Sequence, residues 1–357
     1  MTEPRIAVVI PCYKVQAKVL DVLARIGPEV AAVYVVDDAC PEKSGDLVER
    51  ESRDKRVRVL RHERNRGVGA ATLTGMQTAA AEGATILVKI DGDGQMDPAL
   101  VPTFVGPIVR GEADYTKGNR FFAPENLRGM PGFRIFGNGL FSFVTKLSSG
   151  YWSILDPANG YLAIHAAIFD LLPKDKIAPR FFFEADMLFR LSLVRARVID
   201  IPLRAAYGDE ISNLRAHKEM MPFLWYLTRN LMKRLVYSYF VRDFSIGSVY
   251  LLFGLPILTF GVVFGLTEWV SYASSGAFAS AGTVMLAALP IIVGFQLLLA
   301  FLGYDIANVP RTAIHPRLAV EGGVVATATS ASPPPVPKRR TADEAAERSR
   351  SRVGKSR

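Results

Sequence analysis

Cysteine and histidine are scarce in this sequence, which has two of the former and four of the latter in 357 residues. Zinc-finger spacings, RNA-binding aromatic motifs and basic base-reading helices are missing, so the sequence does not predict a nucleic-acid-binding protein. No signal-peptide hydrophobic stretch opens the N-terminus. Cys12 and Cys40 each follow an apolar run, a placement that is compatible with a disulfide. A reduced pair is the favoured interpretation, because nothing in the sequence indicates export.

Charge is nearly missing from one long stretch and concentrated in another. Residues 244–304 contain a single charged side chain, Glu268, whereas residues 311–357 contain ten Lys or Arg and four Asp or Glu. The tail therefore carries +6 of the net charge of +9. Beyond Val320 the sequence is rich in Ala, Ser, Thr and Pro. Residues 307–357 are predicted to form a cytoplasmic, largely disordered basic tail.

Four short apolar runs near the N-terminus alternate with helical patterns. Continuous hydrophobicity is typical of strands buried on both faces, as in a parallel sheet. We therefore predict an α/β domain over residues 1–215 with a mostly parallel central sheet, whose ligands bind beyond the carboxyl ends of the strands. The predicted strands are Ile6–Ile10, Ala32–Val36, Val57–Leu60 and Ile86–Ile90, and the predicted helices are Val19–Ile26, Gly45–Arg53 and Gly67–Ala81.

Two uncharged segments follow this domain. Residues 244–267 and 283–304 are each long enough to cross a bilayer as a helix, which takes about 20 residues. Lysine and arginine flank the pair on its outer sides, and the linker between the segments has neither. The positive-inside rule then places both termini in the cytoplasm. The sequence predicts an integral membrane protein with two transmembrane helices within residues 244–306.

Residues 216–243 are predicted to form an amphipathic helix at the membrane surface. Arg229, Asn230, Lys233 and Arg234 recur on one helical face, opposite a leucine-rich face. A basic amphipathic helix suits an anionic membrane surface. An ordinary packed helix has the same pattern and is the alternative.

Acidic residues gather where two of the predicted strands end. Asp37 and Asp38 follow the second strand, and the fourth strand runs into Asp-Gly-Asp-Gly-Gln at 91–95. Carboxylate and amide oxygens are the ligands that suit Mg²⁺ or Mn²⁺. A metal ion at Asp91, Asp93 and Gln95 would hold a nucleotide diphosphate and stabilise its charge. The sequence therefore predicts a metal and diphosphate site at this edge of the sheet.

These motifs, taken in order, resemble family-2 glycosyltransferases with the GT-A fold. The similarity rests on Ile-Pro-Cys-Tyr at 10–13, Val-Val-Asp-Asp at 35–38 and the acidic segment at 91–95. Gly-Asn-Arg at 118–120, Asp-Pro-Ala-Asn-Gly-Tyr at 156–161 and the paired apolar segments resemble the polyprenyl-phosphate branch, which includes the dolichyl-phosphate mannose synthases. The resemblance covers residues 5–305. It implies a GT-A domain, a nucleotide-sugar donor, Mg²⁺ or Mn²⁺ as cofactor, and a polyprenyl phosphate acceptor.

The resemblance also implies roles for individual residues. The nucleotide would be bordered by Pro11, Tyr13, Asp37, Asp38 and Asp91. The acceptor phosphate would be held by Arg120, Arg134 and Asn138, and the arginine fork suits bidentate binding of an oxyanion. The sugar would be contacted by Asn159 and Glu184. Catalysis would involve Asp93, Arg120 and Asp186.

The acids Glu184 and Asp186 have two alternative roles. In enzymes of this fold that glycosylate hydroxyl groups, an acid in this region removes the acceptor proton. A phosphate acceptor has a second pKa near 6 and is already ionised, so it needs no base. The two acids would then orient the sugar or bind Arg180.

The resemblance predicts an inverting transfer of a hexose to a polyprenyl phosphate at the cytoplasmic membrane face. The alternatives are transfer to a glycan hydroxyl in surface polysaccharide synthesis and a non-catalytic membrane subunit. Processive synthases, which transfer sugars to a glycan hydroxyl, carry a Gln-x-x-Arg-Trp motif, and this sequence has no such motif. Tyr-Lys-Val at 13–15 replaces the Tyr-Asn-Glu common in the family, so UDP and GDP donors both stay open. Related enzymes assemble through membrane helices, and a homo-oligomer is compatible with this sequence.

Overall fold

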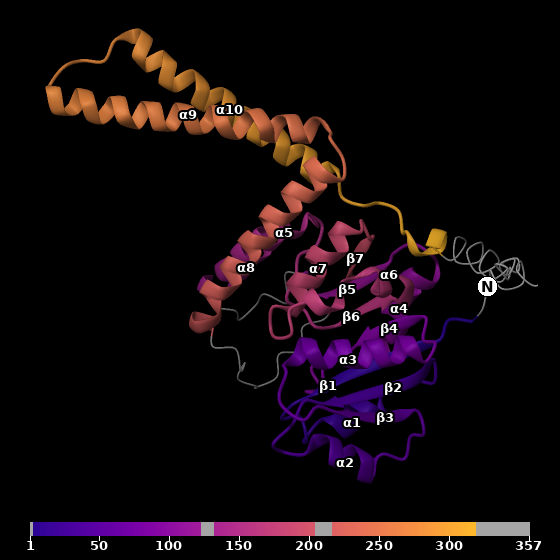
Figure 1. The fold of residues 1–357 in the computed structure, drawn as a ribbon. Helices are drawn as coiled ribbons and strands as arrows, with labels where there is room; N and C mark the ends of the chain where they lie inside the picture. The colour runs from indigo at the N-terminus through magenta and orange to yellow at the C-terminus, as the bar shows by residue number, and fades with distance from the viewer. Residues whose placement is uncertain (1–2, 123–131, 204–215, 319–357) are drawn as a thin grey trace, which may run out of the picture. The chain divides into compact units, whose positions relative to one another are not determined.

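The computed structural model of the chain describes residues 3–122, 132–203 and 216–318 (Figure 1). Residues 307–318 of the predicted disordered tail are among those described, and the rest of the tail lies outside them. The described part begins with alternating strands and helices, as predicted, and ends with two long helices.

Seven strands form one sheet in the order β3-β2-β1-β4-β6-β5-β7. Strand β6 runs antiparallel to both of its neighbours, and the other adjacent pairs are parallel. The prediction of a mostly parallel sheet is confirmed. The strands are β1 (Ile6–Cys12), β2 (Val30–Asp37), β3 (Val57–Arg61), β4 (Ile86–Lys89), β5 (Tyr115–Asn119), β6 (Leu162–His165) and β7 (Val198–Pro202).

Helices cover both faces of this sheet, which explains the continuous apolar runs. Alternate side chains of β1, such as Val8 and Ile10, join a core formed with α1, α2 and α4. The other face of β1 packs on α3, where Gly75 gives room for Val9. The helices of this region are α1 (Val19–Ala24), α2 (Ser44–Glu51), α3 (Val68–Ala81), α4 (Val101–Val109), α5 (Gly132–Ser149), α6 (Ala166–Leu171) and α7 (Phe183–Leu193), with short 3-10 turns at Pro98–Leu100 and Lys174–Lys176.

The carboxyl ends of the central strands meet at one edge of the sheet. Cys12 at the end of β1 is in register with Asp37 at the end of β2. On the other side of β1, Val9 pairs with Lys89, the last residue of β4. The acidic segment that follows β4 therefore begins beside the turns after β1 and β2, as predicted from the parallel arrangement.

Helix α8 (Ala216–Val236) continues into a π-helical turn at Tyr237–Val241. Its predicted basic face is not a single exposed surface, because Asn230 and Arg234 are buried. Both side chains are turned inward by buried carboxylates: Asn230 Nδ2 donates to Asp186 and Arg234 to Asp305. The exposed side of α8 is instead largely apolar and includes Met221, Leu224, Trp225, Met232 and Val236.

Helices α9 (Ile246–Ser275) and α10 (Ala281–Ala307) are long and apolar enough to cross a membrane. Only 11% of the most apolar stretch of each helix is buried, which argues against core helices of a soluble domain. Gly254 and Gly261, seven residues apart on α9, lie directly against α10. On α10, Gly294 faces Leu258 in the same way. Small residues thus let the two helices approach closely.

This close approach makes Gly294 sensitive to substitution. A Cβ at this position would lie 2.5 Å from the backbone nitrogen of Leu258, which cannot yield easily. We expect Gly294→Ala to lower the free energy of unfolding in detergent by about 1–3 kcal/mol, as overpacking does elsewhere. Gly303→Ala on the same helix is the matched control, because no atom lies within 4 Å of its Cβ position. Equal unfolding of the two variants would contradict the packing described.

The chain returns from α10 to the sheet through residues 313–316. Asp114, which precedes β5, is fully buried and accepts hydrogen bonds from the backbone of Ile314 and His315. It also accepts one from His315 Nδ1 at 2.8 Å. The His315 ring stacks on His165 with ring centroids 4.2 Å apart. The segment after the second long helix is thereby fastened to the ends of β5 and β6.

We expect the protein to lose stability at acidic pH because of His165. Burial, with a smaller contribution from His315, lowers the pKa of His165 to about 4, while Asp114 opposes the shift. Between that value and about 6.5 the unfolded chain binds more protons than the folded chain. The free energy of unfolding is therefore lost as the pH falls through this window.

His165→Asn tests this expectation and keeps an acceptor for the Ala167 N–H at the start of α6. Urea unfolding at about pH 7 and about pH 5 should show a smaller loss of stability in the variant than in the wild type. The same loss in both proteins would exclude His165 as its source.

Candidate functional site

The predicted metal-binding segment forms a tight turn after β4. The Asp93 carboxylate accepts the N–H of Gln95 at 3.0 Å, and Gly94 has φ +79°, a conformation that favours glycine. Gly92 packs against Cys12 and Val15, so that a Cβ there would lie 3.1 Å from the Val15 side chain. The structure therefore brings the acidic turn against the end of β1, where the predicted nucleotide-binding residue Pro11 lies, and the turn that follows, which contains Tyr13.

Asp37 and Asp38 bind backbone at the same edge. The Asp37 oxygens accept the N–H groups of Cys40 and Gly45, both at 2.7 Å. The Asp38 oxygens accept N–H groups of residues 66 and 67, at 2.8 and 2.7 Å, and Oδ1 also contacts a ring nitrogen of His62. Both acids thus shape the turns that would surround a nucleotide. Direct contact with the nucleotide stays a prediction.

A buried lysine links the acidic turn to helix α7. Lys89 is 1% exposed, and its Nζ lies 2.7 Å from Asp91 Oδ1 and 3.2 Å from Glu184 Oε1. It also donates to the backbone oxygen of Gly160 at 3.3 Å. Burial disfavours the ammonium, but the two carboxylates outweigh it and raise the pKa of Lys89 above its usual value. The lysine stays charged and fixes Asp91 and Glu184 to the end of β4.

The segment at 156–161 packs between β4 and β5. A Cβ on Gly160 would lie 2.5 Å from both Asp91 Oδ2 and Lys89 Nζ, so a larger residue there would displace the ends of these side chains. The carbonyl of Asn159 accepts a hydrogen bond from Lys117, a second fully buried lysine. Burial lowers the pKa of Lys117 to about 8, although Glu184 raises it. This segment thus provides backbone acceptors for two lysines beneath the edge.

Arg120, at the end of β5, is paired with buried Asp156. Its Nε lies 2.7 Å and its Nη2 3.1 Å from the Asp156 oxygens, and its backbone N–H also donates to this carboxylate. Asn159 Nδ2 donates to the same carboxylate at 3.3 Å. The pair holds the Arg120 guanidinium in a fixed orientation, as binding of an acceptor phosphate would need.

The other two predicted acceptor residues lie on α5. Asn138 is half-buried, and the side chain of Arg134 lies outside the described residues. Their predicted roles therefore stay predictions.

The acids of α7 are both buried and paired, in different ways. Glu184 faces Lys89, and so lies beneath the predicted metal-binding turn. Asp186 is 1% exposed and accepts hydrogen bonds from the Ala178 N–H at 3.0 Å and from Asn230 at 2.9 Å. It also lies 3.4 Å from Arg190. Asp186 thus joins α7 to α8, and its predicted part in catalysis stays a prediction.

The acidic turn offers ligands suited to a divalent cation that is bound together with a nucleotide diphosphate. Among the described residues, no three Asp, Glu, His or Cys side chains form a group able to hold a metal ion alone. Asp91, Asp93 and Gln95 supply hard oxygen donors on one short turn. Mg²⁺ and Mn²⁺ are often held by one or two carboxylates and completed by substrate phosphates. The donor set therefore suits a metal bound together with a diphosphate.

Sequence reasoning missed the two buried lysines. Lys89 interrupts an apolar strand, Ile-Leu-Val-Lys-Ile, and Lys117 lies within the short strand Tyr-Thr-Lys-Gly-Asn. A charged residue in a strand buried on both faces must be paired, and that rule could have singled them out. Their partners, at residues 159, 160 and 184, are too distant in sequence to be identified by spacing.

An acidic turn at the carboxyl edge of a mostly parallel sheet of this kind is the architecture of a GT-A glycosyltransferase. Residues 7–172 match the family described as Glycosyl transferase family 2. The family that matches is the one predicted from the motifs.

Curated relatives agree with this assignment. UDP-N-acetylglucosamine--dolichyl-phosphate N-acetylglucosaminyltransferase of Methanococcus voltae is 30% identical over 47% of this chain and 66% of its own length, just under two thirds. Undecaprenyl-phosphate mannosyltransferase of Micrococcus luteus is 27% identical over 56% of this chain and 82% of its own length. Among solved structures, glucosyl-3-phosphoglycerate synthase from Mycobacterium tuberculosis with Mn²⁺ and UDP has a TM-score of 0.49 at 21% identity, over 65% of this chain and 80% of that one.

The Lys89–Glu184 ion pair should contribute measurably to the free energy of unfolding. Lys89→Met leaves two carboxylates facing each other without their cation, which should cost about 3–5 kcal/mol in the free energy of unfolding. Lys89→Met/Glu184→Gln removes one of those charges and should recover part of the loss. Urea unfolding of wild type, both single variants and the double variant gives the coupling directly. Additive effects of the two substitutions would show that the pair does not interact as described.

Proposed function

We propose that this chain transfers a hexose from a UDP- or GDP-sugar to a polyprenyl phosphate at the cytoplasmic face of a membrane. The names of two relatives support this acceptor class: dolichyl phosphate in one case and undecaprenyl phosphate in the other. The two long apolar helices support a site beside the bilayer. Lysine and arginine on the outer sides of the helix pair favour a cytoplasmic domain.

Glu184 and Asp186 are each paired with other groups, and this observation supports a phosphate over a hydroxyl as the acceptor. A hydroxyl acceptor needs a base, whereas a phosphate monoester with a second pKa near 6 is ionised at neutral pH. Glu184 is held by Lys89, and Asp186 binds Asn230 and the backbone of residue 178. Neither acid is arranged to remove a proton, and a phosphate acceptor requires no such group.

The proposed step is a single displacement. An oxygen of the lipid phosphate attacks the anomeric carbon from the side opposite the leaving group and forms the new C–O bond. The bond to the nucleotide diphosphate breaks, and its electron pair leaves on the diphosphate oxygen. An α-linked donor would therefore give a β-linked product.

The protein contributes alignment and charge to this step. Asp91, Asp93 and Gln95 would hold Mg²⁺ or Mn²⁺, which neutralises charge developing on the diphosphate. Arg120, oriented by Asp156, would face the acceptor phosphate, together with Arg134 and Asn138 on α5. Asn159 would meet the sugar.

The test uses the purified full-length chain in vesicles with undecaprenyl phosphate, Mn²⁺ and, separately, UDP-glucose, UDP-N-acetylglucosamine and GDP-mannose. Formation of a lipid-linked sugar with one donor is the expected result. Transfer to an added glycan but never to the lipid would favour the hydroxyl-acceptor alternative. Absence of metal-dependent turnover with every donor and acceptor would favour a non-catalytic subunit.

Asp93→Ala should abolish turnover in this assay while the protein folds and inserts normally. The Asp93 carboxylate lies on the turn proposed to bind the metal, so its loss should lower the rate by about a hundredfold or more. Asp97→Ala, four residues further on, is the matched acidic control outside the proposed metal site. Near-normal turnover of Asp93→Ala at saturating Mn²⁺ would remove this residue from the site.

A further inference from the structure

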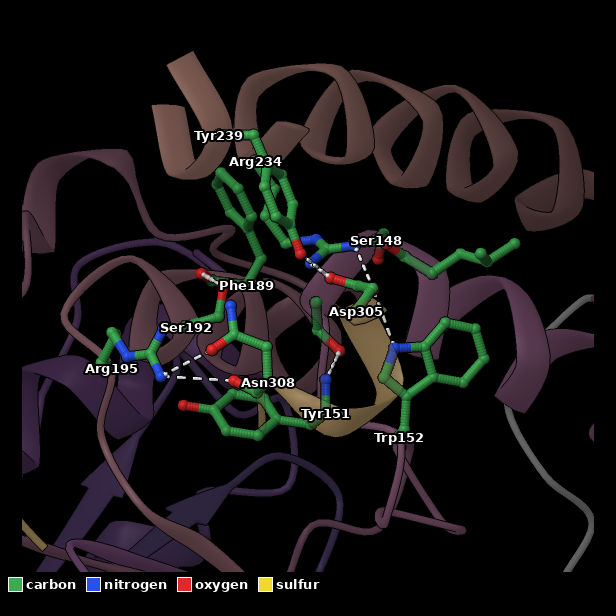
Figure 2. Close-up of polar contacts among 12 residues, drawn as sticks. Ser148, Tyr151, Trp152, Phe189, Ser192, Arg195, Arg234, Tyr239, Asp305 and Asn308 are labelled. Carbon is green, nitrogen blue, oxygen red and sulfur yellow. Dashed lines mark hydrogen bonds and ion pairs between the residues drawn. The ribbon is translucent and has the colours of Figure 1, made fainter. Parts of the chain in front are cut away.

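A buried carboxylate lies where the second long helix meets the family-2 domain. Asp305, in the last turn of α10, is only 4% exposed (Figure 2). Arg234 donates to it with both terminal nitrogens, at 2.7 and 3.0 Å. The indole N–H of Trp152 donates at 2.8 Å, and the hydroxyl of Tyr239 also donates to it. We call Asp305, Arg234, Trp152 and Tyr239 the Asp305 cluster.

The cluster joins parts of the chain that are far apart in sequence. Arg234 comes from α8 and Tyr239 from the π-helical turn, whereas Trp152 follows α5. Arg234 also donates to the backbone oxygen of Leu147, near the end of α5. A buried carboxylate with four directed hydrogen bonds permits little change in the relative positions of these elements, since each lost bond leaves a buried polar group unpaired.

A second contact lies about one helical turn beyond Asp305 and reinforces the Asp305 cluster. Asn308, directly after α10, accepts hydrogen bonds from Arg195 through its side chain at 3.1 Å and its backbone at 3.3 Å (Figure 2). Arg195 follows α7. The end of α10 is thus bound on two sides to the domain.

Two short connections lead from the cluster to the proposed acceptor-phosphate residues. The first is the five-residue segment from Trp152 to Asp156, which ends at the carboxylate that orients Arg120. This segment is itself fixed, because Ile154 is buried and the Leu155 N–H donates to Asp200.

The second connection is helix α5. The backbone oxygen of Leu147 contacts Arg234 near its C-terminal end, and Asn138 lies nine residues earlier in the same helix. Ser142, between them, donates to the backbone oxygen of Leu155 and ties the helix to the first connection. At 1.5 Å per residue, α5 carries the constraint over roughly 15–20 Å to Asn138 and Arg134.

We propose that the Asp305 cluster positions the acceptor-phosphate site relative to the long apolar helices, and so relative to the bilayer. This inference rests on the proposed function. Trp152, Arg234 and Asp305 are positioning residues, since they act through Arg120 and α5 and do not touch the reacting atoms. A misplacement of about 1 Å at a reacting group is enough to cost a large factor in rate.

The inference is tested by steady-state kinetics of the full chain in vesicles containing undecaprenyl phosphate. Trp152→Phe removes the indole N–H with part of the ring system and retains a smaller aromatic ring beside Phe143. Asp305→Leu/Arg234→Met removes both charges together and leaves neither one buried and unpaired. Trp269→Phe, on an exposed tryptophan of α9, is the matched control. The donor is whichever of UDP-glucose, UDP-N-acetylglucosamine and GDP-mannose the wild type uses.

We expect Trp152→Phe to raise the KM for undecaprenyl phosphate about fivefold and the double variant about tenfold, with the KM for the nucleotide sugar within about twofold of wild type. Trp269→Phe should match the wild type in both constants. A purely structural role would reduce the amount of active enzyme and leave both KM values unchanged. That result, or an equal rise in both KM values, would overturn the inference.

Trp152→Phe decides the question if the double variant does not fold. Failure of the wild type to use undecaprenyl phosphate would overturn the proposed function, and the inference with it. Failure of the inference alone would appear as normal wild-type turnover with no selective change in the variants.

Discussion

One buried ammonium group holds the acidic turn after β4 to the interior of the domain. Lys89 cannot remain charged inside a sheet without partners, and it obtains them from Asp91 on the following turn and Glu184 on α7. The turn itself contains Gly92 and Gly94, and glycine restricts the backbone less than other residues do. Its first acid is therefore fixed from the interior of the domain. Gly160 belongs to the same arrangement, because a Cβ there would lie 2.5 Å from both Lys89 Nζ and Asp91 Oδ2.

Much of the first half of the fold is predictable because its signals are local. The strands β1 to β4 are short apolar runs, and their carboxyl ends meet as parallel pairing requires. Strand β6 is different: four residues, Leu162–His165, enter antiparallel between β4 and β5. Nothing in those four residues specifies their neighbours. Two of the partners of Lys89, Gly160 and Glu184, are likewise 71 and 95 residues away, so the motifs indicate the edge of the sheet but not the interactions beneath it.

Helix α8 shows why amphipathic patterns are ambiguous. Its polar residues Asn230 and Arg234 recur with helical spacing and were predicted to face a membrane surface. The structure turns them inward, because Asp186 and Asp305 are buried and require donors. Apolar side chains such as Trp225 occupy the exposed side instead. Helical spacing reveals that two faces differ, but which one is buried depends on partners elsewhere in the chain.

Two groups of carboxylates in this protein differ in what they bind. Those on the turn after β4 are the proposed ligands of a cation that would come with a diphosphate, and Asp91 among them is also paired with Lys89. Those in the interior, such as Asp156, Glu184, Asp186 and Asp305, are each paired with Arg, Lys or Asn. An enzyme whose acceptor must lose a proton would need to keep one interior acid available for that step. An ionised phosphate acceptor removes this requirement, so every interior acid can serve to hold one element against another. A phosphate acceptor would thus need no catalytic base, and the buried carboxylates would be left to align the proposed acceptor site with the long apolar helices.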